Sequence, residues 1–251
     1  MELTTQQVLT YIDCPIKYAL TYNARIKPDT ESLHELWSKA MHTAAYYFWY
    51  RLMDAKRVTE QEMLDKWESL WYKALGITRE DIIFSRRDER VDLGLKGTSI
   101  LQGFMRNISA TPSVPICIAK EFSVPIGDHV ISGNFEVVRE TKEPGKRLIE
   151  IIDYKTGQTI PDQTMVDMDL ALSIQSYAFR HMFQAKEQRL TYYYMRHNRS
   201  INTVRESLHY RRMIETIKAV ADSIQSNIYY PRQTFMCKSC TYKQYCDVWP
   251  T

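Results

Sequence analysis

An acidic residue and a lysine stand two positions apart near the middle of the chain, at Asp153 and Lys155. They close an apolar run beginning at Leu148 that is typical of a buried strand. Residues two apart in a strand point to the same face, so the carboxylate and the ammonium can share one site. A carboxylate there can bind a hard divalent cation, and the ammonium can orient a water or stabilise charge developing on a phosphate. The alternative is a chance pair on the protein surface.

A second carboxylate, Glu136, lies between the apolar residues Phe135 and Val137 in the preceding run. If the two runs form a hairpin, Glu136 comes close to Asp153 and can share a metal ion with it. The alternative is a solvated charge at the edge of a sheet. His42 lies among small residues in a segment with helical periodicity, where an imidazole can act as a metal ligand. A single histidine on a helix is otherwise a structural or surface residue.

The two ends of the chain carry four cysteines that could bind one metal centre. Cys237, Cys240 and Cys246 form a C-x2-C-x5-C pattern, and Cys14 lies more than 220 residues earlier. Four thiolates can hold a [4Fe–4S] cluster or a zinc ion, and the spacing alone leaves both open, with free thiols as a third possibility. Joining the ends closes a long loop and should stabilise the fold. The fifth cysteine, Cys117, stands in an apolar run and is predicted to be a buried core thiol.

The composition is that of an ordinary globular protein. The 251 residues suffice for one large domain, and hydrophobic and charged residues make up 44% and 25% of them. A net charge of +3 permits nucleic-acid binding without arguing for it. No apolar run approaches the ~18–20 residues that span a bilayer, and the N-terminus lacks the layout of a signal peptide. We therefore expect an intracellular, cytoplasmic protein with no membrane partner, in which cysteines bind metal rather than form disulfides.

The elements that must position these residues form a helical region followed by a mixed sheet with packing helices, an α/β architecture. Helical periodicity covers residues 4–13, 15–22, 31–56, a segment starting at 59, and 93–108. Residues 114–125, 129–140 and 147–154 are predicted to form a β-meander with turns at 127–128 and 144–145. Beyond it we expect a helix at 165–184, strands at 190–195 and 203–208, and a helix at 210–227. One domain is expected over 1–251, with a helical region at 1–112, a core at 113–230 and a tail at 231–251.

Taken in chain order, these motifs resemble the RecB-like branch of the PD-(D/E)XK nucleases, which includes the AddB nuclease domain and the CRISPR-associated RecB-like exonucleases. Those families open with C-P-x-x-[FY], matched by residues 14–18. G-x-x-x-H follows, matched by residues 38–42 with serine in place of glycine. G-x-x-D is matched by residues 133–136 with glutamate in place of aspartate. The [DE]-x-K motif is matched by residues 153–155, and the cluster cysteines by residues 237–246.

The family also has a Q-x-x-x-Y helix, which we place at Ser173 to Tyr177. Ser173 then stands where the family has glutamine, and Gln175 lies nearby. The resemblance implies that these three residues position the DNA, and the serine puts that positioning in doubt. It also implies a restriction-endonuclease-like core made of a mixed central sheet flanked by helices.

For the reaction centre, the resemblance implies one or two Mg²⁺ or Mn²⁺ ions. The expected ligands are His42, Glu136, Asp153 and the carbonyl of Tyr154, a mixed oxygen and imidazole set that suits Mn²⁺. The metal would lower the pKa of a bound water, and Lys155 would orient that water for attack. For the chain ends, the resemblance favours an iron–sulfur cluster over zinc.

The function implied is a DNA exonuclease or end-processing nuclease that prefers single strands or duplex ends. It would serve phage or prokaryotic recombination, repair or CRISPR adaptation. The chain has no Walker motif, so any helicase must be a partner protein. Two alternatives remain. One is a module that binds DNA or assembles with other proteins, has weak or no catalytic activity and carries a structural cluster. The other is a protein-interaction domain whose ends are joined by a zinc ion.

Overall fold

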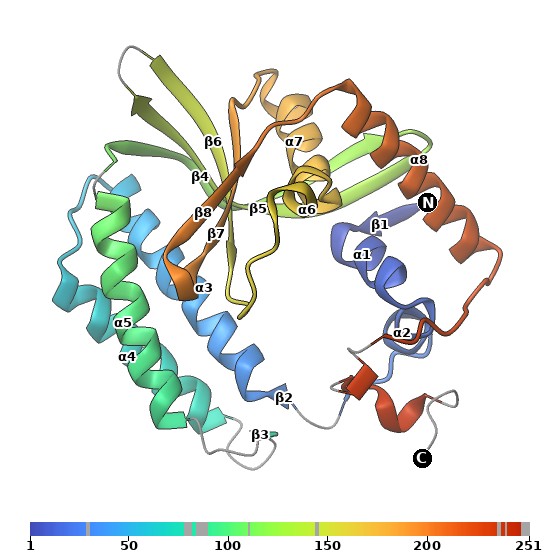
Figure 1. Cartoon of the computed structure of the whole chain (residues 1–251), viewed down its shortest axis with the longest axis horizontal. Coiled ribbons are helices and arrows are strands. Elements are labelled where there is room, and N and C mark those ends of the chain that lie inside the picture. Colours follow the sequence, from blue (N-terminus) through green and yellow to red (C-terminus); the bar gives the residue numbers. More distant parts are fainter. Residues whose placement is uncertain are drawn as a thin grey trace.

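A mixed β-sheet runs through the centre of the molecule, with helices on both of its faces (Figure 1). The computed structural model describes residues 1–28, 31–77, 82–83, 90–109, 111–143, 146–234, 237–238 and 240–246. This architecture confirms the predicted α/β class and the N-terminal helical region. Among the described residues, no helix is both long and apolar enough to cross a membrane.

The central sheet has six strands, ordered β1-β5-β6-β7-β8, with β4 also paired to β5. Their bounds are Glu2–Thr4 for β1, Ser113–Ile126 for β4, His129–Glu143 for β5, Lys146–Lys155 for β6, Arg189–Tyr194 for β7 and Arg199–Thr203 for β8. Strands β4, β5 and β6 follow one another in antiparallel pairs, which confirms the predicted meander. Strand β7 pairs parallel with β6 and antiparallel with β8. The short strands β2 (Glu31–Ser32) and β3 (Ile82–Ile83) form a separate parallel pair.

Strand β5 has two partners along one edge, and the sheet forks between them. Strand β4 occupies the other edge of β5 over nearly its whole length. On the forked edge, β1 pairs with β5 as far as Ser132, whereas the pairing with β6 begins at Val137. Gly133 lies at the fork because a Cβ there would come within 2.6 Å of the Phe122 ring and 2.8 Å of the Thr5 hydroxyl. The fork leaves room beside residues 133–136.

Helices cover the two faces of the sheet and bury a separate hydrophobic core on each. Their bounds are Thr5–Asp13 for α1, Pro15–Tyr18 for α2, Leu33–Met53 for α3, Glu60–Ile77 for α4, Arg90–Ser109 for α5, Gln163–Asp167 for α6, Leu170–Phe183 for α7 and Ser207–Gln225 for α8. Helices α3, α4 and α5 lie on one face, and α1, α7 and α8 on the other (Figure 1). In β6, Ile151 enters the α7 core and Ile152 the α3 core, so both faces of this strand are buried.

Local sequence explains which face α3 buries and where α4 begins. The α3 helix buries the periodic apolar residues predicted for it, among them Trp37, Met41 and Phe48. At the start of α4, the Thr59 hydroxyl accepts from the amide of Glu62, and the Glu62 carboxylate accepts from the amide of Thr59. This reciprocal capping confirms the predicted helix start.

Two sequence predictions in the C-terminal half were wrong. The single helix expected at 165–184 is divided into α6 and α7, because Asp169 caps a new helix by accepting from the amide of Leu172 at 2.9 Å. The strand expected at 203–208 lies instead at Arg199–Thr203. It ends there because the Arg205 guanidinium turns inward and donates to the carbonyls of Val166 and Asp169, each at 3.0 Å. The turn expected at 144–145 lies outside the described residues.

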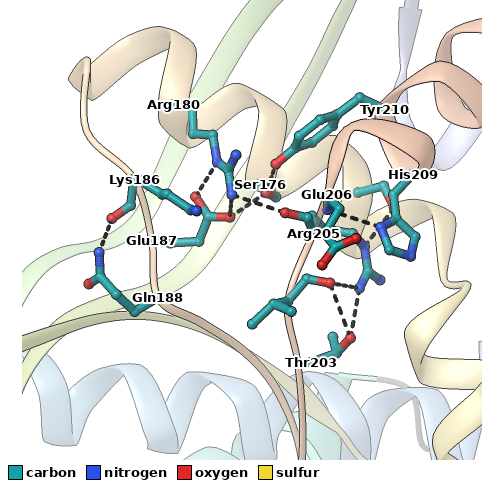
Figure 2. Close-up of polar contacts among 12 residues, drawn as sticks. Ser176, Arg180, Lys186, Glu187, Gln188, Thr203, Arg205, Glu206, His209 and Tyr210 are labelled. Atoms are coloured by element: carbon teal, nitrogen blue, oxygen red, sulfur yellow. Dashed lines mark hydrogen bonds and ion pairs between the residues drawn. The ribbon is translucent and has the colours of Figure 1, made fainter.

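A buried polar network fixes α7 against β8 and α8 (Figure 2). Glu187 is buried and accepts two hydrogen bonds from Arg180 at 2.8 Å and one from Ser176 at 2.5 Å. The hydroxyl of Ser176 lies 2.6 Å from that of Tyr210 in α8, and Arg205 donates to Ser173 at 2.8 Å. The network therefore holds the helix that faces the sheet fork in a set rotation.

Short helical turns complete the described residues. Among them are the π-helical turn Ala19–Asn23 after α2, the 3-10 turn η2 at Met195–His197 after β7 and the 3-10 turn Lys243–Tyr245 in the tail. The described part of the tail, as far as Cys246, returns to the N-terminal helices on the same side of the sheet (Figure 1).

Candidate active site

A cavity of about 1190 Å³ opens at the sheet fork, and four different elements supply its polar wall. His42 comes from α3, Glu136 from β5, Asp153 and Lys155 from β6, and Gln175 from α7. The structure therefore brings together side chains that lie more than 130 positions apart in the sequence. The fork makes this convergence possible, because a neighbouring strand paired along the whole of this edge of β5 would cover Glu136.

Asp153 and Lys155 point from the end of β6 into this cavity and form an ion pair. The Lys155 ammonium lies 2.8 Å from one carboxylate oxygen of Asp153, and the Gln175 amide donates to the other at 3.1 Å. Burial raises the pKa of Asp153 above its ordinary value although Lys155 lies beside it, because only 7% of the residue is exposed to water. A further positive charge would stabilise the ionised carboxylate.

Glu136 bridges the helix that carries His42 and the strand that carries Asp153. One of its oxygens lies 2.8 Å from His42 Nδ1, and the other accepts the backbone amide of Tyr154 at 2.6 Å. Burial by itself would lower the pKa of His42, but the hydrogen bond and the charge of Glu136 outweigh it and raise that pKa. Glu136 thus acts as the common partner of two elements at the fork.

The chemistry of these side chains fits a divalent metal ion. Carboxylate oxygens with one imidazole are the donors that Mg²⁺ and Mn²⁺ accept. Among the residues the structure describes, no three His, Cys, Asp or Glu side chains are arranged as a ready ligand set. Instead, each carboxylate already has a protein partner, the His42 imidazole for Glu136 and the Lys155 ammonium for Asp153. A bound metal would compensate the charge of both carboxylates.

The side chain of Tyr154 points away from the cavity and into the α3 core. It is almost fully buried, and its hydroxyl accepts from the indole of Trp49 at 2.6 Å. On the same face, Glu150 forms a buried ion pair with Arg139 at 2.7 Å. Only the backbone of Tyr154 is therefore placed to serve the site, and Glu150 faces away from Asp153, as expected for residues three apart in a strand.

On α7 the residue that reaches the site is Gln175, not Ser173. Gln175 lines the cavity, and its buried Oε1 has no hydrogen-bond partner among the described residues. Ser173 lies about 200° around the helix and bonds to Asp169 and Arg205. Tyr177 stacks on His181 and, like Ser173, does not line the cavity. The sequence could not show which of these residues faces the cavity, because periodicity does not fix the rotation of a helix.

Several residues that contact the site were not found by sequence reasoning. The Lys155 ammonium lies 4.2 Å from the centre of the Tyr192 ring, and the Tyr192 hydroxyl donates to Asp169 at 2.6 Å. The signal for Tyr192 was the parallel pairing of β6 and β7, which sets it opposite Asp153. Thr156, which also lines the cavity, accepts from Arg196 at 2.6 Å through its carbonyl.

The four terminal cysteines lie on segments that pack together, but the described residues do not show them as one ligand set. All four are free and half-buried, and Cys14 stands between α1 and α2. The segment leading to Cys237 lies along these helices, where Arg232 donates to the carbonyl of Ile12 and the Tyr11 hydroxyl donates to that of Ile228. The donor set and the chain path therefore suit a metal centre that joins the ends.

The fifth cysteine behaves as the sequence predicted. Cys117 lies in β4 with 8% of its surface exposed and belongs to the core beneath α7. Burial raises the pKa of its thiol to about 11. Cys117 is therefore a packing residue and stands apart from the terminal four.

Comparison with known proteins identifies the family of the chain. A family model described as the PD-(D/E)XK nuclease superfamily matches residues 2–247, nearly the whole chain. Among solved structures, the crystal structure of SSO0001 is similar at 15% sequence identity, covering 97% of this chain and 96% of that one with a TM-score of 0.35. No curated protein matches the sequence.

Proposed function

Because the chain belongs to the PD-(D/E)XK nuclease superfamily, we propose that it is a metal-dependent nuclease that hydrolyses phosphodiester bonds of DNA at or near strand ends. One observation carries the proposal above all. The acid–lysine pair of β6, the carboxylate of β5 and the imidazole of α3 meet in one cavity at the fork of the sheet. A protein that only bound DNA would not need this convergence.

In the proposed reaction, water attacks phosphorus, a new P–O bond forms, and the bond to the leaving sugar oxygen breaks. His42, Glu136, Asp153 and the Tyr154 carbonyl would hold Mg²⁺ or Mn²⁺, which supplies a water of lowered pKa and neutralises phosphate charge. Lys155 orients the attacking water and stabilises the charge that develops on the phosphate oxygens. Gln175 donates to Asp153 at 3.1 Å and would help to hold that carboxylate in place for the metal.

We further propose that Cys14, Cys237, Cys240 and Cys246 hold a [4Fe–4S] cluster that fastens the tail to α1 and α2. The support is the four free thiols on segments that pack together. The cluster would supply cross-linking of the chain ends, whose stabilisation grows with the length of the loop closed. A role in recombination, repair or CRISPR adaptation beside a helicase partner fits a nuclease of this kind.

The test uses anaerobically purified protein with end-labelled single-stranded and duplex DNA. We expect cleavage with Mn²⁺ and none with a chelator, and loss of cleavage in Asp153→Asn and Lys155→Ala. Asp222→Asn, an exposed aspartate on α8, is the matched control and should keep full activity. If wild type and both site variants show the same trace cleavage while all bind DNA, the inactive binding module replaces the nuclease.

A further inference from the structure

A second, smaller cavity meets the active-site cavity at one residue, Gln6 of α1. The second cavity has a volume of about 440 Å³ and lies between α1, the turn after α2 and the C-terminal tail. Gln6 lines both cavities, and Thr4 and Thr5 of the same helix start line the larger one. A continuous polar surface therefore leads from the fork of the sheet along α1.

The wall of the second cavity carries groups that suit a phosphate backbone. It includes the ammonium of Lys17, the hydroxyl of Thr241 and the amide of Gln6. Thr10 and Thr21 also line it, but Thr10 is buried and accepts from Gln6, and the Thr21 hydroxyl donates to the carbonyl of Lys17 at 2.7 Å. Such side chains make most protein contacts to phosphate and sugar. Lys17 is half-buried there and forms no ion pair with any residue that the structure describes. Its charge is thus available to an anionic ligand.

An aromatic ring at the border of the same cavity points to a single strand. Tyr22, half-buried against Tyr18, lines the cavity; Tyr242 of the tail lines it too but is buried, with 7% of its surface exposed. Tyrosine rings provide stacking surfaces for unpaired bases, and a base is unpaired only in a single strand.

We propose that the second cavity binds the single strand of DNA that continues from the cleaved bond, with Lys17 on a phosphate and Tyr22 on a base. This rests on the nuclease function proposed above and assigns the substrate a single-stranded extension. The nine residues of α1 are about 13.5 Å long, so the path spans roughly four stacked nucleotides at 3.4 Å each. Glu35, on the same wall, opposes binding and limits its strength.

The test compares affinities for strands of two lengths in the Lys155→Ala background with Mn²⁺, where cleavage is absent. Lys17→Ala should weaken binding of a 20-nucleotide strand several-fold and reduce the slope of log affinity against log salt by about 0.7, the effect of one phosphate contact. Strands of three or four nucleotides should be unaffected, and Glu35→Gln should tighten binding of the long strand. Lys218→Ala, an exposed lysine on α8, is the matched control. Equal slopes and affinities for Lys17→Ala and Lys218→Ala overturn the inference.

A second measurement leaves Lys17 unchanged. An iodouracil-labelled strand should photo-crosslink to Tyr22, and crosslinks only to other residues overturn the inference. Cleavage by the wild-type protein is measured separately, so the two proposals fail differently. If the wild-type protein shows no cleavage with Mn²⁺, the nuclease proposal is wrong. If it cleaves DNA, but strand binding does not depend on Lys17 and no crosslink to Tyr22 forms, only the proposed strand path is wrong.

Discussion

The hydroxyl of Ser38 lies 2.7 Å from the hydroxyl of Thr156, so α3 is bonded directly to the segment that follows Lys155. Ser38 stands where the resembling families have glycine, four residues before His42. The same segment is held from its other side by Arg196, which packs over the Trp37 ring at 4.1 Å. The serine therefore adds a tie between the elements that carry the histidine and the lysine.

Ser38→Ala should lower kcat without changing the affinity for Mn²⁺. The lost hydrogen bond contributes about 1 kcal/mol, which corresponds to a rate decrease of roughly five-fold if all of it serves positioning. Thr43→Ala is the control, because Thr43 on the same helix bonds only to the carbonyl of Lys39 and is exposed. Steady-state cleavage across a Mn²⁺ titration measures both quantities. A Ser38→Ala enzyme with wild-type kcat would mean that the hydrogen bond between Ser38 and Thr156 contributes only to the stability of the fold.

Glu136→Asp should weaken Mn²⁺ binding and slow cleavage. The family resemblance alone predicts retained activity, because aspartate is the family's residue at this position. The geometry predicts otherwise, since one carboxylate reaches both His42 at 2.8 Å and the amide of Tyr154 at 2.6 Å, and a side chain shorter by one methylene loses one of these contacts. Glu136→Gln keeps the length and removes the charge, so it should lose activity more completely. The readout is the Mn²⁺ concentration that gives half-maximal cleavage.

The sequence sufficed for the meander and for the residues at its ends, because alternation and turn residues are local signals. Asp153 and Lys155 share a face for the same local reason. The sequence could not predict the rotation of α7 about its axis, because that rotation depends on contacts with Arg205 and the buried Glu187. Ser173 was therefore expected in the place that Gln175 occupies. The contact between the Lys155 ammonium and the Tyr192 ring could not be predicted either, because it depends on the pairing of β6 with β7, which no single segment specifies.

Tyr154→Phe should destabilise the fold without changing the chemistry of the folded enzyme. It removes the acceptor of the buried Trp49 indole, and an unsatisfied buried donor costs about 1–3 kcal/mol. The hydroxyl lies on the face opposite the cavity, so kcat per folded molecule should stay at the wild-type value. Urea unfolding and single-turnover cleavage separate the two effects. Tyr72→Phe, an exposed tyrosine on α4, is the control. A large fall in kcat with unchanged stability would contradict this assignment.

The five cysteines should fall into two classes in alkylation experiments at pH 8. In protein purified anaerobically with adequate iron, Cys14, Cys237, Cys240 and Cys246 should be protected as cluster ligands and the protein should be brown. Removing the iron should expose these four half-buried thiols to the reagent.

Cys117 should react only after unfolding. Burial raises its pKa to about 11, so at pH 8 the folded protein keeps it as a neutral, unreactive thiol. The unfolded chain ionises that thiol near its ordinary pKa of ~8.5, so the stability gained from keeping it neutral is lost as the pH rises from about 8.5 towards 11. Cys240→Ala should lose iron and lower the unfolding temperature, whereas Cys117→Ser should keep the iron. Mass spectrometry of the labelled peptides and iron analysis give the result. Stoichiometric zinc without iron, or four reactive thiols in fresh protein, would remove the iron–sulfur proposal while leaving the nuclease site untouched.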